Sequence, residues 1–346
     1  MTRTRTSTAT LAFPQGVRRA REAELRGDTV AALQGYEEAL LTLESPGTDP
    51  RAADLLRWIG TVHRERGETD RAERRYRESL AVAEEIRYRP GVAHALNCLA
   101  AIALRRGTLQ EAEVHFQRAK RLASQVGEVR LDGMIEQNLG VLYNIRGDLD
   151  GAVVHYRAAL ERFRQARDSE MVGIVLNNLG MLHTDQRQWD EAEQVYEEAL
   201  EEARREGNLM LENALEVNRA ELATAKARWE AAEEASRRAR SLAQYRHDRI
   251  REAEALKFQA VAERERGRAE QAERLLREAG ALAVDADDSL LSAEVARELG
   301  DLFQRTGRYE DAKTQLSRAL DLFRLIGATV DSSDVESRLE RLPVPV

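Results

Sequence analysis

Apolar residues recur along most of the chain at spacings of three, four and seven, with charged residues between them, and this pattern predicts a succession of amphipathic helices. The pattern also returns as a whole every forty residues. Four successive segments that begin at Arg26, Arg66, Arg106 and Arg146 are RGDTVAALQGYEEAL, RGETDRAERRYRESL, RGTLQEAEVHFQRAK and RGDLDGAVVHYRAAL, and four further copies follow without an insertion. Such a period indicates tandem copies of one supersecondary unit, each covered by its neighbours.

Small residues occupy three columns of this repeat. Glycine stands in one slot of six copies, with Arg187 and Ala227 in the same slot of the fifth and sixth: Gly27, Gly67, Gly107, Gly147, Gly267 and Gly307. Alanine follows five residues later in every copy: Ala32, Ala72, Ala112, Ala152, Ala192, Ala232, Ala272 and Ala312. The third small column lies upstream of each turn: Gly60, Ala100, Gly140, Gly180, Ala220, Ala260 and Gly300. Because only glycine or alanine lets two helix backbones approach closely, these columns predict a hairpin of two antiparallel helices in each copy.

A column of large residues completes the repeat and carries a family resemblance. Its members are Tyr36, Tyr76, Phe116, Tyr156 and Tyr196, followed by Ser236, Leu276 and Leu316. Small, large and aromatic residues at these relative positions resemble the tetratricopeptide family, over roughly Pro14 to Ile326. The usual repeat has about 34 residues, and the longer one here is similar to the repeats of kinesin light chains, of the LGN/Pins adaptors and of bacterial Rap regulators. The resemblance implies an all-α, right-handed superhelix of eight helix-turn-helix repeats with a C-terminal capping helix.

The repeat divides the chain as follows. Residues 1–13 and 343–346 are predicted to be disordered tails, and 328–342 a capping helix with Val335 and Leu339 one turn apart. Eight repeats fill 14–326, at about 14–46, 50–87, 90–127, 128–167, 168–207, 208–247, 248–286 and 288–326. The first repeat is predicted to consist of helices Pro14–Arg26 and Asp28–Glu44.

Copies six and seven depart from the pattern. Polar residues stand at positions that are apolar or aromatic in other copies, among them Glu216, Arg219, Ser236 and Gln259. One interpretation is ordinary drift, in which Leu211, Leu215 and Leu222 shift the buried stripe. The alternative is that Ala220–Ala283 forms a softer segment that moves or is covered by a partner.

Composition narrows the classes of function. The 53 basic and 61 acidic residues give a net charge of −8, so nucleic acid is not expected as a partner. Cys98 is the only cysteine, which rules out an intrachain disulfide and fits a reducing compartment. Since no run of about 18 apolar residues occurs, no membrane association is expected and the predicted location is the cytoplasm.

The sequence contains no recognisable catalytic or cofactor motif. Phosphate loops, nucleophile elbows and paired metal motifs are missing. His115 and His155 share one slot of the repeat, as do His63 and His183, so repetition alone accounts for both pairs. We therefore predict that the chain is not an enzyme and uses no metal or other cofactor.

The resemblance places a ligand groove along the first helix of each repeat. In this family the positions nine and ten residues before each turn face the ligand, and here they hold Arg57, Trp58, Asn97, Gln137, Asn138, Asn177, Asn178 and Asn218. A carboxamide both donates and accepts hydrogen bonds, so Asn138, Asn178 and Asn218 are the favoured ligands for the backbone of an extended peptide. In the alternative, these asparagines bond to neighbouring helices and only maintain the superhelix. The Lys–Asn pair by which chaperone adaptors of the family bind a C-terminal carboxylate is missing.

These observations favour a scaffold or adaptor that binds a protein or peptide segment in its concave groove. The main alternative is the sensory portion of a bacterial signalling protein whose output domain lies elsewhere or is truncated. Self-association, for instance through the exposed end of the first hairpin, is left open.

Overall fold

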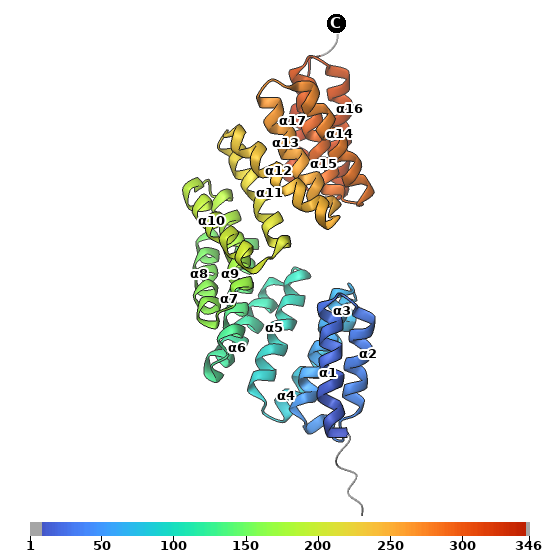
Figure 1. Ribbon diagram of the computed structural model, residues 1–346, viewed down its shortest axis with the longest axis vertical. Helices are drawn as coiled ribbons and strands as arrows, with labels where there is room; N and C mark the ends of the chain where they lie inside the picture. The colour runs from blue at the N-terminus through green and yellow to red at the C-terminus, as the bar shows by residue number, and fades with distance from the viewer. Residues whose placement is uncertain (1–8, 344–346) are drawn as a thin grey trace, which may run out of the picture. The chain divides into compact units, whose positions relative to one another are not determined.

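The computed structural model describes residues 9–343, and throughout this range it consists of α-helices, one 3-10 helix and short turns (Figure 1). The chain forms two compact units, which meet in sequence at Asp168 and Ser169. The first unit contains α1 (Ala9–Leu25), α2 (Thr29–Leu41), η1 (Pro46–Thr48), α3 (Pro50–Glu65), α4 (Thr69–Glu85), α5 (Arg89–Arg105), α6 (Leu109–Val126), α7 (Val129–Ile145) and α8 (Leu149–Ala166). The second contains α9 (Ser169–Asp185), α10 (Trp189–Glu206), α11 (Leu209–Ala225), α12 (Trp229–Arg246), α13 (Arg249–Glu265), α14 (Ala269–Asp285), α15 (Ser289–Arg305), α16 (Tyr309–Leu325) and α17 (Thr329–Glu340). The prediction of an all-α solenoid is confirmed.

The glycine column closes the turn inside each hairpin. Gly67, for example, has a φ of 75°, in the left-handed region that costs a residue with a side chain about 1–2 kcal/mol. The amide of the next residue, Glu68, then bonds to the carbonyl of His63, a bond that terminates the helix. Arg187 and Ala227 adopt the same left-handed conformation without being glycine.

The small and large columns pack against each other as the sequence predicts. A Cβ added to Gly140 would lie 2.6 Å from the ring of Tyr156, so the ring lies directly on the glycine backbone. Gly60 has the same relation to Tyr76. The alanine column is fully buried from Ala32 to Ala312. Packing in these hairpins thus depends on one small and one large residue sixteen positions apart, whereas the sixth copy has Ser236 in place of the large residue.

The first helices form the more crowded layer in each unit. Neighbouring first helices touch directly, as α3 touches α5 and α11 touches α13. In the described part of the chain, no two second helices pack closely against each other. The second helices are therefore splayed apart, and the first helices line the inner, concave side of each unit.

Several predicted boundaries need correction. Helix α1 begins at Ala9, so residues 9–13 are helical and not a tail. The prediction took Pro14 as the first residue because proline is common in the first turn of a helix, but the helix begins before it. The second helix ends at Leu41 and not at Glu44, because the chain then turns through η1, where Pro46 cannot continue a helix. The remaining tail predictions, for 1–8 and 344–346, lie outside the described residues. At the other end, α17 covers the last hairpin, with Val335 fully buried.

Candidate functional site

Each first helix leaves one stripe of side chains partly uncovered on the inner side of its unit. In α7, Gln137, Asn138 and Val141 are half-buried, while Leu139 and Leu142 are fully buried. The residues predicted to face a ligand therefore lie on the inner stripe of their helices, with Asn97 and Asn218 more deeply buried than the rest.

Four of the six predicted carboxamides bond to one another. Nδ2 of Asn138 donates to Oδ1 of Asn97 over 3.1 Å, in the first unit. Nδ2 of Asn218 donates to Oδ1 of Asn177 over 2.8 Å, in the second. Asn97 and Asn218 are only 5% and 9% exposed. These bonds link α5 to α7 and α9 to α11, so part of the carboxamide row has the architectural role that the sequence left as an alternative.

The carboxamide row keeps bonding capacity beyond these pairs. Asn97, Asn138 and Asn218 each use one hydrogen or one oxygen in these pairs, and Asn177 also donates from Nδ2 to the sulfur of Met181 over 3.7 Å. An asparagine side chain has two donors and an acceptor with two lone pairs. Among the residues that the structure describes, Gln137 and Asn178 make no side-chain hydrogen bond, and both are half-buried on the inner stripe. These two side chains are the carboxamides with the most capacity left for a bound ligand.

Arg57 and Trp58 are held by neighbours in the first unit. The Arg57 guanidinium lies 5.5 Å from the Trp58 ring centroid and donates to Asp54 over 3.4 Å. Trp58 also lies against Tyr36, with ring centroids 5.6 Å apart. The Nε of Arg57 is buried without a hydrogen-bond partner, which leaves a donor unsatisfied on this inner face.

The inner faces of the two units differ in charge. In the first, burial and then the charges of Arg57 and Arg130 lower the pKa of His94 to about 4. In the second, Asp185 and Glu221 lie at the surface, but the surrounding protein withdraws part of their hydration and raises the pKa of both carboxyls. His94 in the first unit therefore has cations nearby, whereas Glu221 in the second unit has Lys257 together with the carboxylates of Glu294, Asp185 and Glu254 nearby. The sequence interpretation missed this contrast, although the repeat register would have revealed it.

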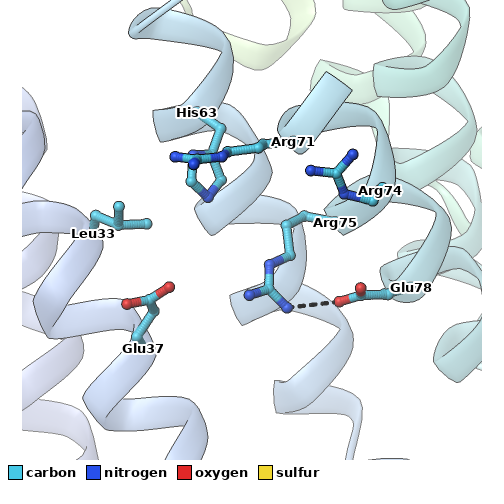
Figure 2. A pocket seen from close by; sticks show the side chains of 7 residues that line it. All are labelled: Leu33, Glu37, His63, Arg71, Arg74, Arg75 and Glu78. Atoms are coloured by element: carbon cyan, nitrogen blue, oxygen red, sulfur yellow. Dashed lines mark hydrogen bonds and ion pairs between the residues drawn. The ribbon is translucent and has the colours of Figure 1, made fainter. Parts of the chain in front are cut away.

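A cavity of about 380 Å³ opens on the other side of the first unit, between the second helices α2 and α4 (Figure 2). Its lining comprises Leu33, Glu37, His63, Arg71, Arg74, Arg75 and Glu78. Arg71 and the Nδ1 of His63 both contact Glu68, at 3.1 and 2.7 Å, and Arg75 pairs with Glu78 at 2.8 Å. Because most of its cations are already paired with carboxylates, this cavity does not resemble a prepared catalytic site.

The histidines take packing or ion-pairing positions. Nδ1 of His183 lies 2.6 Å from Oε1 of Gln188, in the same place as the His63 contact, and Nδ1 of His155 lies 2.7 Å from Oε2 of Glu136. Within residues 9–343, no three His, Cys, Asp or Glu side chains gather as metal ligands. No helix in the described part combines the length and apolar character needed to cross a bilayer.

Comparison with protein families identifies the repeat. Two family models described as tetratricopeptide repeat match the chain, one over residues 91–165 and again over 131–205, the other over 58–86. Residues 58–86 and 91–205 are tetratricopeptide repeats. No curated protein matches this chain at the level of sequence.

Solved structures with the same fold include several regulators. A STAND signalling ATPase with a tetratricopeptide-repeat sensor, from Pyrococcus horikoshii, is 18% identical with a TM-score of 0.73; the match covers 94% of this chain and 49% of that one. Aspartyl phosphate phosphatase F from Bacillus subtilis is 14% identical with a TM-score of 0.59, covering 80% and 71%. The Rap conjugation gene regulator of plasmid pLS20, solved with the Phr* peptide, is 16% identical with a TM-score of 0.55, covering 78% and 77%. This chain spans about half the length of the STAND protein, and at these identities the likeness shows the fold alone.

Proposed function

We propose that this protein is an interaction scaffold or adaptor that binds an extended segment of a partner protein along the inner faces of its first helices. The observation that carries the proposal is the set of carboxamides in each unit. In the first unit Gln137 has no hydrogen bond within the described chain, beside the Asn97–Asn138 pair, and in the second unit Asn178 has none, beside the Asn177–Asn218 pair. Carboxamides on successive helices match the alternating donors and acceptors of an extended backbone, whatever its side chains are.

The Rap regulator solved with the Phr* peptide supports this proposal by analogy. That protein shares the fold and binds a peptide, so a peptide ligand is compatible with an array of this length. The analogy does not extend to particular residues, because only 16% of the aligned positions are identical.

Affinity capture tests the proposal. The folded protein serves as bait in a lysate of its own organism, and bound proteins are quantified by mass spectrometry for the wild type and for Gln137→Ala/Asn178→Ala. With about 1 kcal/mol for each lost hydrogen bond, the double variant should bind its partner roughly 30-fold more weakly. The matched control is Gln110→Ala/Gln194→Ala, which changes two exposed carboxamides on α6 and α10 and should have no effect on capture.

Equal capture by the wild type and Gln137→Ala/Asn178→Ala would contradict the assignment of the groove. The triple change at Asn138, Asn178 and Asn218 is a less clean test, because it also removes the bonds that two of these residues make to neighbouring helices.

A second candidate function is the sensory part of a signalling protein. The specific observation in its favour is the STAND ATPase, in which a tetratricopeptide-repeat sensor accompanies other domains and of which this chain spans about half. If the gene encodes a cyclase, phosphohydrolase or DNA-binding domain in the same reading frame, that function is favoured over a free adaptor.

The proposal assigns no catalysis and no cofactor to the chain, and it places the protein in the cytoplasm. Protein or peptide is the proposed ligand class, because the net charge of −8 disfavours nucleic acid. In an electrophoretic mobility-shift assay at low salt, the purified protein should not retard DNA or RNA. A salt-sensitive complex with nucleic acid would contradict the assignment of a protein or peptide ligand.

A further inference from the structure

Three arginines of one helix line the cavity between α2 and α4 (Figure 2). Arg71, Arg74 and Arg75 stand at positions i, i+3 and i+4 of α4, so they share one face of that helix. The cavity has a volume of about 380 Å³, which lies within the range of sites that bind small molecules. Guanidinium groups gathered on one wall of a cavity indicate a site for an anion.

These arginines are peculiar to the second repeat. The slot of Arg71 holds Ala, Gly, Gln or an acidic residue in the other seven repeats, and the slot of Arg75 holds neither Arg nor Lys in any of them. The slot of Arg74 has one further arginine, at Arg274. The repeat therefore folds without a basic cluster at this place, and the packing of the hairpins does not explain it.

Arg71 shares its carboxylate partner with two other basic groups. Nε of Arg66 and Nη1 of Arg71 each lie 3.1 Å from a carboxylate oxygen of Glu68, and Nδ1 of His63 lies 2.7 Å from it. The Arg71 side chain is 61% exposed, and exposed ion pairs contribute little to stability. Arg71 can therefore exchange Glu68 for an oxygen of a ligand, while Glu68 keeps Arg66 and His63 as partners.

The rest of the lining leaves positive charge available. Arg74 has no ion-pair or hydrogen-bond partner among the described residues, and Arg75 has only Glu78, in a partly exposed pair at 2.8 Å. Glu37 of α2 is half-buried on the opposite wall and has no ion-pair partner within residues 9–343 (Figure 2). Three arginines against two glutamates give the lining an excess of one positive charge.

The three guanidinium groups match a phosphomonoester better than a carboxylate. A phosphomonoester carries about −1.5 to −2 charges at pH 7 and has three terminal oxygens, so each arginine can bond to an oxygen of its own. A carboxylate is already satisfied by one arginine in a bidentate pair. The Glu37 carboxylate disfavours a second anionic group across the cavity, so the other end of the ligand is neutral or cationic.

We propose that the cavity between α2 and α4 binds a phosphomonoester. Its phosphate lies among Arg71, Arg74 and Arg75, and its neutral or cationic end faces Leu33 and Glu37. A small phosphate ester and a phosphorylated side chain of a protein present the same chemistry to this site. Because the site belongs to second helices, it goes beyond the proposed function and does not depend on the carboxamide row.

Isothermal titration calorimetry in phosphate-free buffer at low salt tests the site. The probes are phosphoethanolamine, phosphoglycolate, acetate and an end-capped Gly-phosphoserine-Gly peptide; the first two are similar in size but end in an ammonium and a carboxylate. The proteins are the wild type, Arg71→Gln/Arg74→Gln, Glu37→Gln and a control. The control is Arg121→Gln/Arg157→Gln, which removes two exposed arginines from α6 and α8.

Phosphoethanolamine should bind the wild type and the control equally, and Arg71→Gln/Arg74→Gln about 100-fold more weakly, since two charge-assisted contacts are lost. Phosphoglycolate should bind the wild type at least about threefold more weakly than phosphoethanolamine, and Glu37→Gln should remove this difference. Unchanged helical circular dichroism shows that each variant is folded. Tighter binding of the peptide than of phosphoethanolamine identifies a phosphorylated side chain as the ligand, and the reverse order identifies a small ester.

Three results would overturn the proposal. The first is that neither phosphoethanolamine nor the phosphoserine peptide binds the wild type at millimolar concentration. The second is equal affinity of the wild type and Arg71→Gln/Arg74→Gln for phosphoethanolamine, and the third is that acetate binds as tightly as phosphoethanolamine. None of these results bears on capture through Gln137 and Asn178, so the failure of one proposal is separable from the failure of the other.

Discussion

Glu216 provides a sharp test of how this array is held together. The side chain has no exposed surface and occupies a slot that holds Glu136 in the third repeat but is apolar in four others, at Leu56, Leu96, Leu176 and Leu256. Three arginines surround it, with Arg204 and Arg219 at 3.0 and 2.9 Å and Arg238 at 3.7 Å. The perturbation is Glu216→Leu, which restores the apolar residue.

The expected change in the free energy of unfolding depends on the cost of burying the carboxylate and on the stabilisation from its ion pairs. Burial of a carboxylate costs several kcal/mol, which the ion pairs offset, and apolar replacements of buried ion pairs are often neutral or stabilising by about 1–4 kcal/mol. The side chains of Arg204, Arg219 and Arg238 are 46%, 30% and 49% exposed, so all three cations regain hydration when the carboxylate is removed. We therefore expect Glu216→Leu to be neutral or to stabilise by about 1–2 kcal/mol, and Glu216→Ala to destabilise by about 2 kcal/mol because it leaves a cavity.

Hydrogen exchange of the amides in α10, α11 and α12 is the appropriate assay, because stability in a repeat array is local and one melting temperature averages over all repeats. Thermal melts followed by circular dichroism serve as a second measurement. If Glu216→Leu lowers the protection of these helices by more than about 1 kcal/mol, the ion network is a net stabiliser and the reasoning is refuted.

Three further changes test the turn, the packing and the charge. Ala227 has a φ of 52°, so Ala227→Gly should stabilise the protein by about 0.5–1 kcal/mol in thermal melts, and a lower melting temperature would contradict the assigned turn. Gly140→Ala inserts a Cβ 2.6 Å from the ring of Tyr156 and should destabilise by about 1–3 kcal/mol in the same assay, whereas an unchanged melt would show that the ring can move. Burial works to raise the pKa of Glu136, but the contacts from His155 and Lys120 outweigh it and the pKa lies below its usual 4.5. The stabilisation from this carboxylate is therefore present above about pH 4.5 and is lost as the pH falls through the lowered pKa. The melting temperature of the wild type should therefore fall more steeply than that of Glu136→Gln between about pH 5 and pH 3. Parallel plots of melting temperature against pH for the two proteins would contradict the pairing.

The fold was predictable because small and large residues recur at fixed positions in successive copies of the repeat. Small residues such as Gly140 and large ones such as Tyr156 recur at a fixed separation, and the helical spacing around them makes a helical hairpin the unit that brings them together. Helix ends were less predictable. Pro14 and Pro46 limit where a helix can continue, yet neither sets its first residue, and α1 accordingly begins five residues before Pro14.

The bonding of the predicted carboxamides could be predicted only in part. The repeat register placed Asn97 and Asn138 on the inner stripe, but it could not show that their amides bond to each other, since that depends on the offset between neighbouring helices. The three arginines of α4 were visible in the sequence, at Arg71, Arg74 and Arg75. Their significance was not, because the sequence does not show that a cavity lies beside them.

The central claim is that partners bind to the inner layer formed by the first helices. Hydrogen exchange of the protein with and without a captured partner tests this directly. The account predicts new protection in first helices such as α7 and α11, with the exposed faces of second helices such as α6 and α12 unchanged. Protection confined to the second helices would contradict it.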